Sequence, residues 1–218
     1  MKTIAIIPVR GGSKRLQNKN ILPLGGIPLM AHSILFAQDN SSIINEIYVS
    51  TDDEHIKSCA LQYGVKVIDR PQNLSGDFEP TVTVLKHVLQ TIDDEVENVI
   101  LLQATNPLRP KNILTEAFEV YEENNSDSLF TVTRNYQKFG KIVNNKFIPF
   151  NYIIGQRSQD LDPLYFENGL LYITKAKLIL KEIIISENAI PFEVNHMYAN
   201  VDIDNQQDLD YAEYAIRQ

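Results

Sequence analysis

The feature that most constrains the fold is a regular alternation of strand-like and helix-like segments from residue 3 to residue 133. Apolar runs with the length of buried strands occupy residues 3–9, 46–51, 65–68, 98–103 and 128–133. Stretches with helical periodicity lie between them, at residues 28–39, 53–63, 80–92 and 112–124. Pro28 and Asp53 are placed to open two of these helices, and Gly64 to close the second. Because this alternation is typical of βαβ units, the sequence predicts an α/β fold with helices on both faces of a parallel sheet.

The alternation stops after residue 134. Residues 135–168 are rich in polar and aromatic side chains, and short strand candidates on either side of Asn144-Asn145 predict a hairpin there. Two strand-like runs and a final amphipathic helix then return the chain to the sheet, at residues 169–173, 190–195 and 205–217. We therefore expect a single domain over residues 1–218, with residues 135–168 as an excursion from it.

Charge is unevenly distributed along the chain. The 218 residues carry a formal net charge of −8, which argues against nucleic-acid binding, because proteins of that class present a broad basic face. Four cations nevertheless gather between residues 10 and 19. This asymmetry favours a small anionic ligand that is recognised locally.

Cysteine usage and apolar content predict a cytoplasmic protein. The single cysteine, Cys59, excludes an internal disulfide framework, and no His/Cys cluster has the spacing of a zinc site. The N-terminal apolar run is too short for a signal peptide, and no run reaches the roughly 18 residues that a membrane span needs. We expect no membrane partner.

A candidate anion site lies where the first apolar run ends. That run is followed by Arg10, Gly11, Gly12, Ser13, Lys14, Arg15 and, after a short interval, Lys19. A glycine pair lets backbone N–H groups approach phosphate oxygens closely, and the cations can neutralise several negative charges, so the loop is typical of a polyphosphate site. Its spacing matches neither the Walker loop nor the dinucleotide fingerprint. A solvated basic turn is the alternative interpretation.

A second constellation, Asp202-Ile203-Asp204, lies near the C-terminal end. In an extended segment, side chains two residues apart point the same way, so both carboxylates share one face. Two close carboxylates repel each other unless a cation or proton intervenes, and Mg²⁺ commonly binds one or two carboxylates together with phosphate oxygens. The alternative is a helix N-cap made by Asp204 or Asn205, and the two roles can coexist.

Arg70 is a candidate for reading a nucleotide base. Pro71 forces Arg70 into an extended conformation, and a guanidinium fixed in this way can hydrogen-bond the carbonyl and ring nitrogen of a pyrimidine. The alternative is a surface ion pair with Asp69 or Asp77.

Three later residues have the chemistry of a sugar-acid site. Arg157 can grip a carboxylate through two hydrogen bonds, while Asn168 and Tyr172 can read hydroxyl or acetamido groups. Ordinary surface and core positions are the alternative for all three.

Several motifs occur in the order in which one enzyme family has them. They are Val9 to Arg15 with Lys19-Asn20-Ile21, Val49 to Asp52, Arg70-Pro71, Leu102 to Arg109, Gln159-Asp160-Leu161, Glu167-Asn168-Gly169 and Asp202-Ile203-Asp204. Over nearly the whole chain, the sequence resembles the acylneuraminate cytidylyltransferases, also called CMP-sialic acid synthetases.

This resemblance implies a fold, a reaction and partners. The fold is the Rossmann-like three-layer α/β/α arrangement of nucleotide-diphospho-sugar transferases, with a mostly parallel sheet and a small dimerisation excursion that makes a homodimer. In the implied reaction, the C2 hydroxyl of a nine-carbon keto sugar acid attacks the α-phosphorus of CTP, which releases pyrophosphate and gives a CMP-linked sugar. The cofactor is Mg²⁺, or Mn²⁺, and the product serves lipopolysaccharide or capsule biosynthesis.

The resemblance also assigns residues to roles. Arg10, Lys14, Asp202 and Asp204 are the expected catalytic residues, and the two aspartates are the metal ligands. CTP would contact Arg10, Gly11, Gly12, Ser13, Lys14, Lys19, Asn20 and Arg70. The sugar acid would contact Gln103, Arg157, Asn168 and Tyr172.

The sequence leaves five points open. The family often has a second Arg and a Pro where this chain has Ser158 and Asp162, so the sugar acid can be sialic, legionaminic or pseudaminic. The family's sugar-site lysine aligns with either Lys138 or Lys141, and no general base is assigned. An eight-carbon acid of the KDO type or a nonsugar alcohol is an alternative substrate. A CTP-binding regulatory module without turnover is the alternative from a different class.

Overall fold

A seven-stranded sheet forms the centre of the computed structural model, which describes residues 2–218. The strand order is β11-β7-β10-β6-β1-β4-β5. In chain order, the strands are β1 (Thr3–Pro8), β4 (Glu46–Thr51), β5 (Lys66–Asp69), β6 (Asn98–Leu101), β7 (Ser128–Asn135), β10 (Leu164–Lys175) and β11 (Ile190–Glu193). Two further strands, β2 (Pro23–Leu24) and β3 (Ile27–Pro28), pair with each other outside this sheet.

The predicted mostly parallel sheet is confirmed. β1 pairs in parallel with β4 and β6, β4 with β5, and β11 with β7. β10 runs antiparallel between β6 and β7, and its register shifts between Glu167 and Tyr172. The sequence placed this strand only over residues 169–173, because residues 164–167, which are exposed, fell within the predicted excursion.

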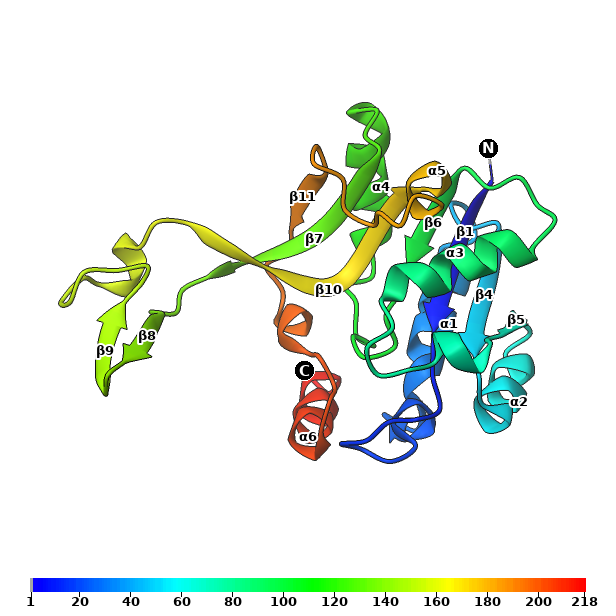
Figure 1. Cartoon of the computed structure of the whole chain (residues 1–218), viewed down its shortest axis with the longest axis horizontal. Coiled ribbons are helices and arrows are strands. Elements are labelled where there is room, and N and C mark those ends of the chain that lie inside the picture. Colours follow the sequence, from blue (N-terminus) through cyan, green and yellow to red (C-terminus); the bar gives the residue numbers. More distant parts are fainter. Residues whose placement is uncertain (1) are drawn as a thin grey trace.

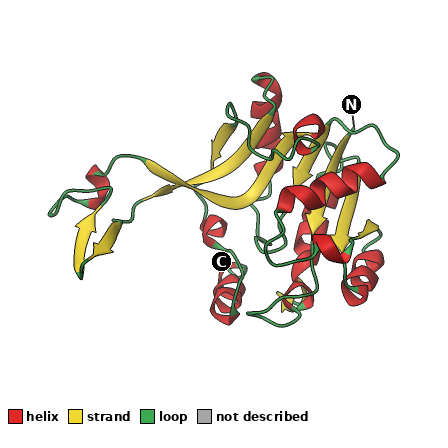
Figure 2. Cartoon of the chain, viewed as in Figure 1, coloured by secondary structure: helices red, strands yellow, loops and turns green. Residues whose placement is uncertain are grey.

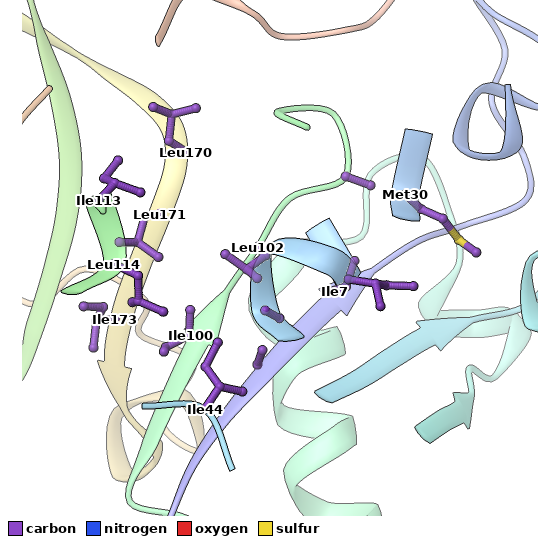
Figure 3. Packing of buried hydrophobic residues seen from close by; sticks show 14 of the residues in the cluster. Ile7, Met30, Ile44, Ile100, Leu102, Ile113, Leu114, Leu170, Leu171 and Ile173 are labelled. Atoms are coloured by element: carbon purple, nitrogen blue, oxygen red, sulfur yellow. The ribbon is translucent and has the colours of Figure 1, made fainter. Parts of the chain in front are cut away.

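Helices cover both faces of the sheet, as predicted (Figures 1 and 2). One face packs against α1 (Leu29–Asp39), α2 (Glu54–Gln62) and α4 (Ile113–Glu123). The other packs against α3 (Thr81–Thr91) and the short α5 (Ala176–Ile179). Alternate residues of the strands serve the two faces, so Ile7 and Ile100 belong to the first core and Ile6 and Leu101 to the second. Figure 3 shows the first core, where side chains from the sheet meet Met30 of α1 and others from α4.

The predicted helix boundaries are confirmed where capping residues define them. The Asp53 carboxylate accepts from the backbone N–H groups of His55 and Ile56 at the start of α2, and Gly64 follows that helix with a φ of 73°. The last helix, α6 (Gln206–Ala215), begins with a capping box made by Asn205 and Asp208. The expected N-cap is therefore Asn205, which leaves the Asp204 side chain free for other contacts.

A third apolar cluster fixes the segment that precedes α6. Val201 and Ile203 are buried there against Leu24, Leu108 and residues of α6. Because Ile203 is fully buried, it anchors the backbone that carries Asp202 and Asp204.

Residues 136–163 form an arm that Figure 1 shows projecting away from the sheet beyond β7 and β10. The predicted hairpin is present in it: β8 (Gly140–Val143) and β9 (Lys146–Pro149) are antiparallel, and Asn144 and Asn145 both have a positive φ. The excursion is thus an extended hairpin joined to the sheet by two long strands. Within residues 2–218, no helix has the length and apolar character to cross a bilayer.

Candidate active site

A cavity of about 480 Å³ lies beyond the carboxyl ends of parallel strands. The loops after β1, β5 and β6 and the segment before α6 come together around it, as expected for an open parallel sheet. Eight predicted residues line the cavity: Arg10, Ser13, Lys14, Lys19, Asn20, Arg70, Gln103 and Asp204. Six do not line it: Gly11, Gly12, Arg157, Asn168, Tyr172 and Asp202.

Two aspartates from opposite sides of the cavity divide the four cations of the basic loop. Arg10 Nη1 lies 2.7 Å from Asp77 Oδ1, and Lys14 also pairs with Asp77. On the other side, the Asp204 carboxylate lies 3.1 Å from Arg15 Nη1 and 2.9 Å from Lys19 Nζ. Each cation of the loop thus pairs with an aspartate, while the Lys14 and Arg15 side chains are 78% and 75% exposed, and the anion site stays a prediction.

Contacts of the main chain hold the basic loop in place. The Gly11 N–H donates to Asp52 Oδ1 at 3.0 Å. A Cβ at Gly11 would lie 2.6 Å from Asp53 Oδ2, so only glycine fits. The buried Asn20 amide donates to the Arg10 carbonyl at 3.0 Å. Gly12 has open space around it, which leaves its backbone accessible to a ligand.

Asp202 and Asp204 flank the buried Ile203, and of the two only Asp204 lines the cavity, so the shared face stays a prediction. Burial and the Asp204 charge raise the pKa of Asp202, while Thr105 and Lys19 act in the opposite direction. A divalent cation would relieve this repulsion, and two carboxylates with phosphate oxygens and waters suit Mg²⁺ or Mn²⁺. No group of three or more His, Cys, Asp or Glu side chains with metal-site geometry occurs in the described part of the chain. A metal ion held by Asp202 and Asp204 would therefore need further ligands, such as phosphate oxygens or waters.

Arg70 is buried and opens into the cavity. Its Nε donates to Ser50 Oγ at 3.3 Å and its Nη2 to the Ser50 carbonyl. Burial lowers the pKa of Arg70 to about 10. The alternative of a surface ion pair is wrong, because Asp69 pairs with Lys57 and Asp77 with the basic loop. Within residues 2–218, the Arg70 guanidinium feels the Asp52 charge but forms no ion pair with a carboxylate, which suits it to a neutral, hydrogen-bonding ligand group.

Gln103 lines the cavity at the end of β6, and a buried arginine fixes its backbone. Arg109 Nη2 donates to the Gln103 carbonyl at 2.9 Å, Nη1 to Ser33 Oγ at 2.9 Å, and Nε to the Leu170 carbonyl at 2.6 Å. This guanidinium therefore ties β10 and α1 to the loop that carries Gln103.

The side chains of Asn168 and Tyr172 are engaged inside the protein. Asn168 Oδ1 accepts from Thr131 Oγ1 at 2.6 Å, and its Nδ2 donates to Thr133 Oγ1 at 3.0 Å. The Tyr172 hydroxyl donates to Glu167 and its ring belongs to the core. Burial and the Glu167 and Asp202 carboxylates raise the pKa of Tyr172. Their predicted contacts with a sugar stay predictions, and Asn168 would have to leave this network to make one.

The arm carries the remaining predicted sugar-site residues. Arg157 lies between β9 and β10 and pairs with Asp160, with Nε 2.7 Å from Oδ2 and Nη2 2.9 Å from Oδ1. Lys138 donates to the Gln156 carbonyl and lies 5.3 Å from the ring centre of Tyr152. Neither lysine candidate lines the cavity of its own chain, so the choice between Lys138 and Lys141 stays open.

Comparison with known proteins identifies the family. The profile of a family described as cytidylyltransferase matches residues 4–216. The pseudaminic acid cytidylyltransferase of Campylobacter jejuni subsp. jejuni serotype O:23/36 is 38% identical over 221 residues, which cover 97% of this chain and 95% of that protein. The chain belongs to the cytidylyltransferase family.

Other relatives of this cytidylyltransferase agree in sequence and in fold. The N-acylneuraminate cytidylyltransferase of Streptococcus agalactiae serotype III is 35% identical over 188 residues, which cover 84% of this chain and 45% of that protein. The solved structure of CMP:2-keto-3-deoxy-manno-octonic acid synthetase complexed with CTP superposes with a TM-score of 0.77 over 100% of this chain and 99% of that one, at 17% identity. The predicted family and three-layer fold are both confirmed.

Asp77 and Thr105 are among the residues of the cytidylyltransferase cavity that sequence reasoning missed. Asp77 was considered only as a partner for Arg70, and Thr105 only as part of a motif, yet both line the cavity. The available signal was position, since each lies in a loop that follows a parallel strand of the sheet.

Proposed function

We propose that this cytidylyltransferase transfers CMP from CTP to the C2 hydroxyl of a nonulosonic acid. The observation that supports this best is the cavity in which a loop with four cations faces the Asp202–Asp204 segment. Such an arrangement suits a triphosphate, a divalent metal and a second substrate at one place. The hydroxyl oxygen forms a bond to the α-phosphorus, the bond from this phosphorus to the β-phosphate's bridging oxygen breaks, and pyrophosphate leaves.

The protein acts mainly by positioning and by neutralising charge. Arg10, Lys14 and Lys19 hold the triphosphate and stabilise the charge that develops on pyrophosphate. Arg70 reads the cytosine ring. Asp202 and Asp204 would hold Mg²⁺ or Mn²⁺, which when bound supplies charge neutralisation at the α-phosphate.

Among the candidate sugar acids, we propose pseudaminic acid as the substrate. The Campylobacter relative of that name is 38% identical to this chain, whereas the N-acylneuraminate enzyme is 35% identical and a CMP-N,N'-diacetyllegionaminic acid synthase of Legionella pneumophila is 33% identical. The altered Arg157–Asp162 segment also departs from the pattern that the resemblance associates with sialic acid.

The decisive experiment measures pyrophosphate release with CTP, Mg²⁺ and each of pseudaminic, legionaminic, sialic and eight-carbon KDO acids. We expect release with pseudaminic acid at a kcat/KM at least tenfold above the others, because differences of a few acetamido and methyl groups are worth about 1–3 kcal/mol. CTP binding without release for every acid would support the regulatory module instead. Turnover with KDO alone would move the substrate to the eight-carbon class.

We also propose that the protein works as a homodimer in the cytoplasm, joined through the arm. Nine large apolar side chains of residues 136–154 are exposed, including Ile142 at 78% and Ile154 at 79%. A monomer seldom exposes so large an apolar surface, and a second copy of this chain offers the matching one. Sedimentation should give a dimer for the wild type and a monomer for Ile142→Asp combined with Phe147→Asp. The lone Cys59 supports the compartment.

A further inference from the structure

Asp77 forms ion pairs with Arg10 and Lys14, two of the cations that the proposed function assigns to the triphosphate. Its two carboxylate oxygens are divided between Arg10 and Lys14, at 2.7 Å from Arg10 Nη1 on one side. These two cations hold the pKa of Asp77 below its usual range, Lys14 contributing most, so the group is a carboxylate near neutral pH. A carboxylate and a phosphate oxygen cannot accept from the same donors without strong mutual repulsion.

The loop that carries Asp77 is lightly attached to the protein. Residues 75–80 connect the short 3-10 turn Gln72–Leu74 to α3. The side chain of Phe78, next to Asp77, is 100% exposed, and a Cβ at Gly76 would meet nothing within 4 Å. Few buried contacts therefore oppose a movement of this loop.

Asp204, the other aspartate of the basic loop, is held quite differently. Its own N–H donates to Asp208 Oδ2 at 2.8 Å, and the preceding Ile203 is fully buried. Asp204 is therefore built into the framework of the site, whereas Asp77 is brought to the site by a loop that can leave it.

We propose that Asp77 is an internal competitor of the substrate's phosphates: CTP displaces it from Arg10 and Lys14, and it returns to them as pyrophosphate leaves. This inference rests on the proposed role of these two cations in holding the triphosphate. In the empty enzyme, Asp77 keeps the cations positioned and neutralised. In the product complex, it replaces the bonds that pyrophosphate loses, so it weakens the hold on this product.

The competing interpretation is that Asp77 holds Arg10 and Lys14 in their working positions throughout turnover. The two interpretations predict opposite changes in the affinity for pyrophosphate and CTP when Asp77 loses its charge. Removing a competitor tightens the binding of pyrophosphate and CTP, whereas removing a permanent support weakens both. The isosteric substitution Asp77→Asn separates them, because it removes the charge and keeps the shape.

The test is calorimetric titration of pyrophosphate into the full-length enzyme with Mg²⁺, together with the KM for CTP. For Asp77→Asn, we expect about tenfold tighter pyrophosphate binding and a lower KM for CTP. The phosphates then no longer have to displace a carboxylate from its charge-assisted hydrogen bonds with Arg10 and Lys14. Unchanged or weaker pyrophosphate binding would overturn the proposal. A thermal melt of each variant verifies that it is folded.

A matched control removes the same charge elsewhere. Asp127 pairs with Lys177 at 2.8 Å and precedes the amino end of β7, whereas the cavity lies beyond the carboxyl ends of the parallel strands. Asp127→Asn should leave pyrophosphate binding unchanged. If pyrophosphate binds as much more tightly to Asp127→Asn as to Asp77→Asn, the change in net charge alone explains the effect and the proposal is rejected.

Two further variants separate the inference from the function on which it rests. Arg10→Ala and Lys14→Ala should each weaken pyrophosphate and CTP binding. If they have no effect, the proposed triphosphate site itself is wrong. If they weaken binding while Asp77→Asn fails to tighten it, only the role of Asp77 is rejected.

Discussion

Asp202 and Asp204 are the two side chains whose removal tests the metal assignment most directly. We predict that Asp202→Asn and Asp204→Asn each lower kcat by about a hundredfold or more, because the loss of charge stabilisation in the transition state costs about 3 kcal/mol. Stability should change little, since Asn205 and Asp208 retain the cap of α6. The measurement is kcat at saturating Mg²⁺, alongside thermal unfolding.

Asp210 offers a matched control for these two variants. It lies in α6, where its carboxylate accepts from the Gln206 side chain at 2.8 Å, and it is exposed to solvent. Asp210→Asn should keep the wild-type rate. Wild-type rates for both Asp202→Asn and Asp204→Asn in saturating Mg²⁺ would contradict the metal assignment.

Glu46 is the residue from which we expect a pH dependence of stability. Hydrogen bonds from Lys66 and Tyr48, with help from Lys2, lower its pKa from 4.5 to about 2. Because the folded pKa lies below the unfolded one, this stabilisation is complete above about pH 4.5 and is lost as the pH falls toward 2. It amounts to at most about 3 kcal/mol.

The variant Glu46→Gln isolates this contribution. Urea unfolding should show the wild type more stable than Glu46→Gln at pH 6, with the difference shrinking steadily between pH 4.5 and 2. A difference that stays constant over this range would show that the carboxylate does not titrate in this way.

At the scale of elements, Arg109 joins three parts of the fold with one buried guanidinium. Arg109→Met keeps the volume of the side chain but leaves the Leu170 carbonyl and the Ser33 hydroxyl without the donor that Arg109 supplies. The Gln103 carbonyl also loses its bond from Arg109, but it still accepts from Ser33 Oγ at 3.3 Å. Each buried group that loses its partner costs about 1–3 kcal/mol. We predict a loss of at least about 3 kcal/mol in the free energy of unfolding, measured by chemical denaturation.

Arg217→Met is the control for this prediction. Arg217 pairs with Glu213 one turn earlier at an exposed position, and such pairs contribute about 0.5 kcal/mol or less. If Arg109→Met and Arg217→Met lowered the free energy of unfolding by similar small amounts, the hydrogen bonds of Arg109 would not stabilise the contacts between these elements.

Elements with a regular apolar pattern could be predicted from the sequence, and those fixed by distant contacts could not. The alternation of residues 3–133 identified the strands and helices because each buries one face in a local, periodic way. The full length of β10 was missed, since residues 164–167 pair with the end of β7 and are exposed. The sequence also gave no sign that Asp77 would meet the basic loop, because their contact depends on a loop 67 positions away in the chain.

At the scale of the whole molecule, the position of the arm changes the interpretation of Arg157. The residue was predicted to grip the sugar carboxylate, but it lies on the arm and does not line the cavity of its own chain. If the arm joins two copies, Arg157 can serve the cavity of the other copy. Its ion pair with Asp160 is exposed and therefore weak enough to exchange for a substrate carboxylate.

We predict from this arrangement that two defective subunits restore each other. Arg157→Ala should raise the KM for the sugar acid tenfold or more without changing CTP binding, because a charge-assisted bond worth about 1.5–3 kcal/mol is lost. Asp204→Asn should abolish turnover. A mixed dimer then contains one site with an intact Asp204 and the partner's intact Arg157, and one site with both defects. After random exchange of equal amounts, about a quarter of the wild-type activity should return at low sugar concentration. If Arg157 serves its own chain's site, every site in the mixture keeps a defect and no activity returns.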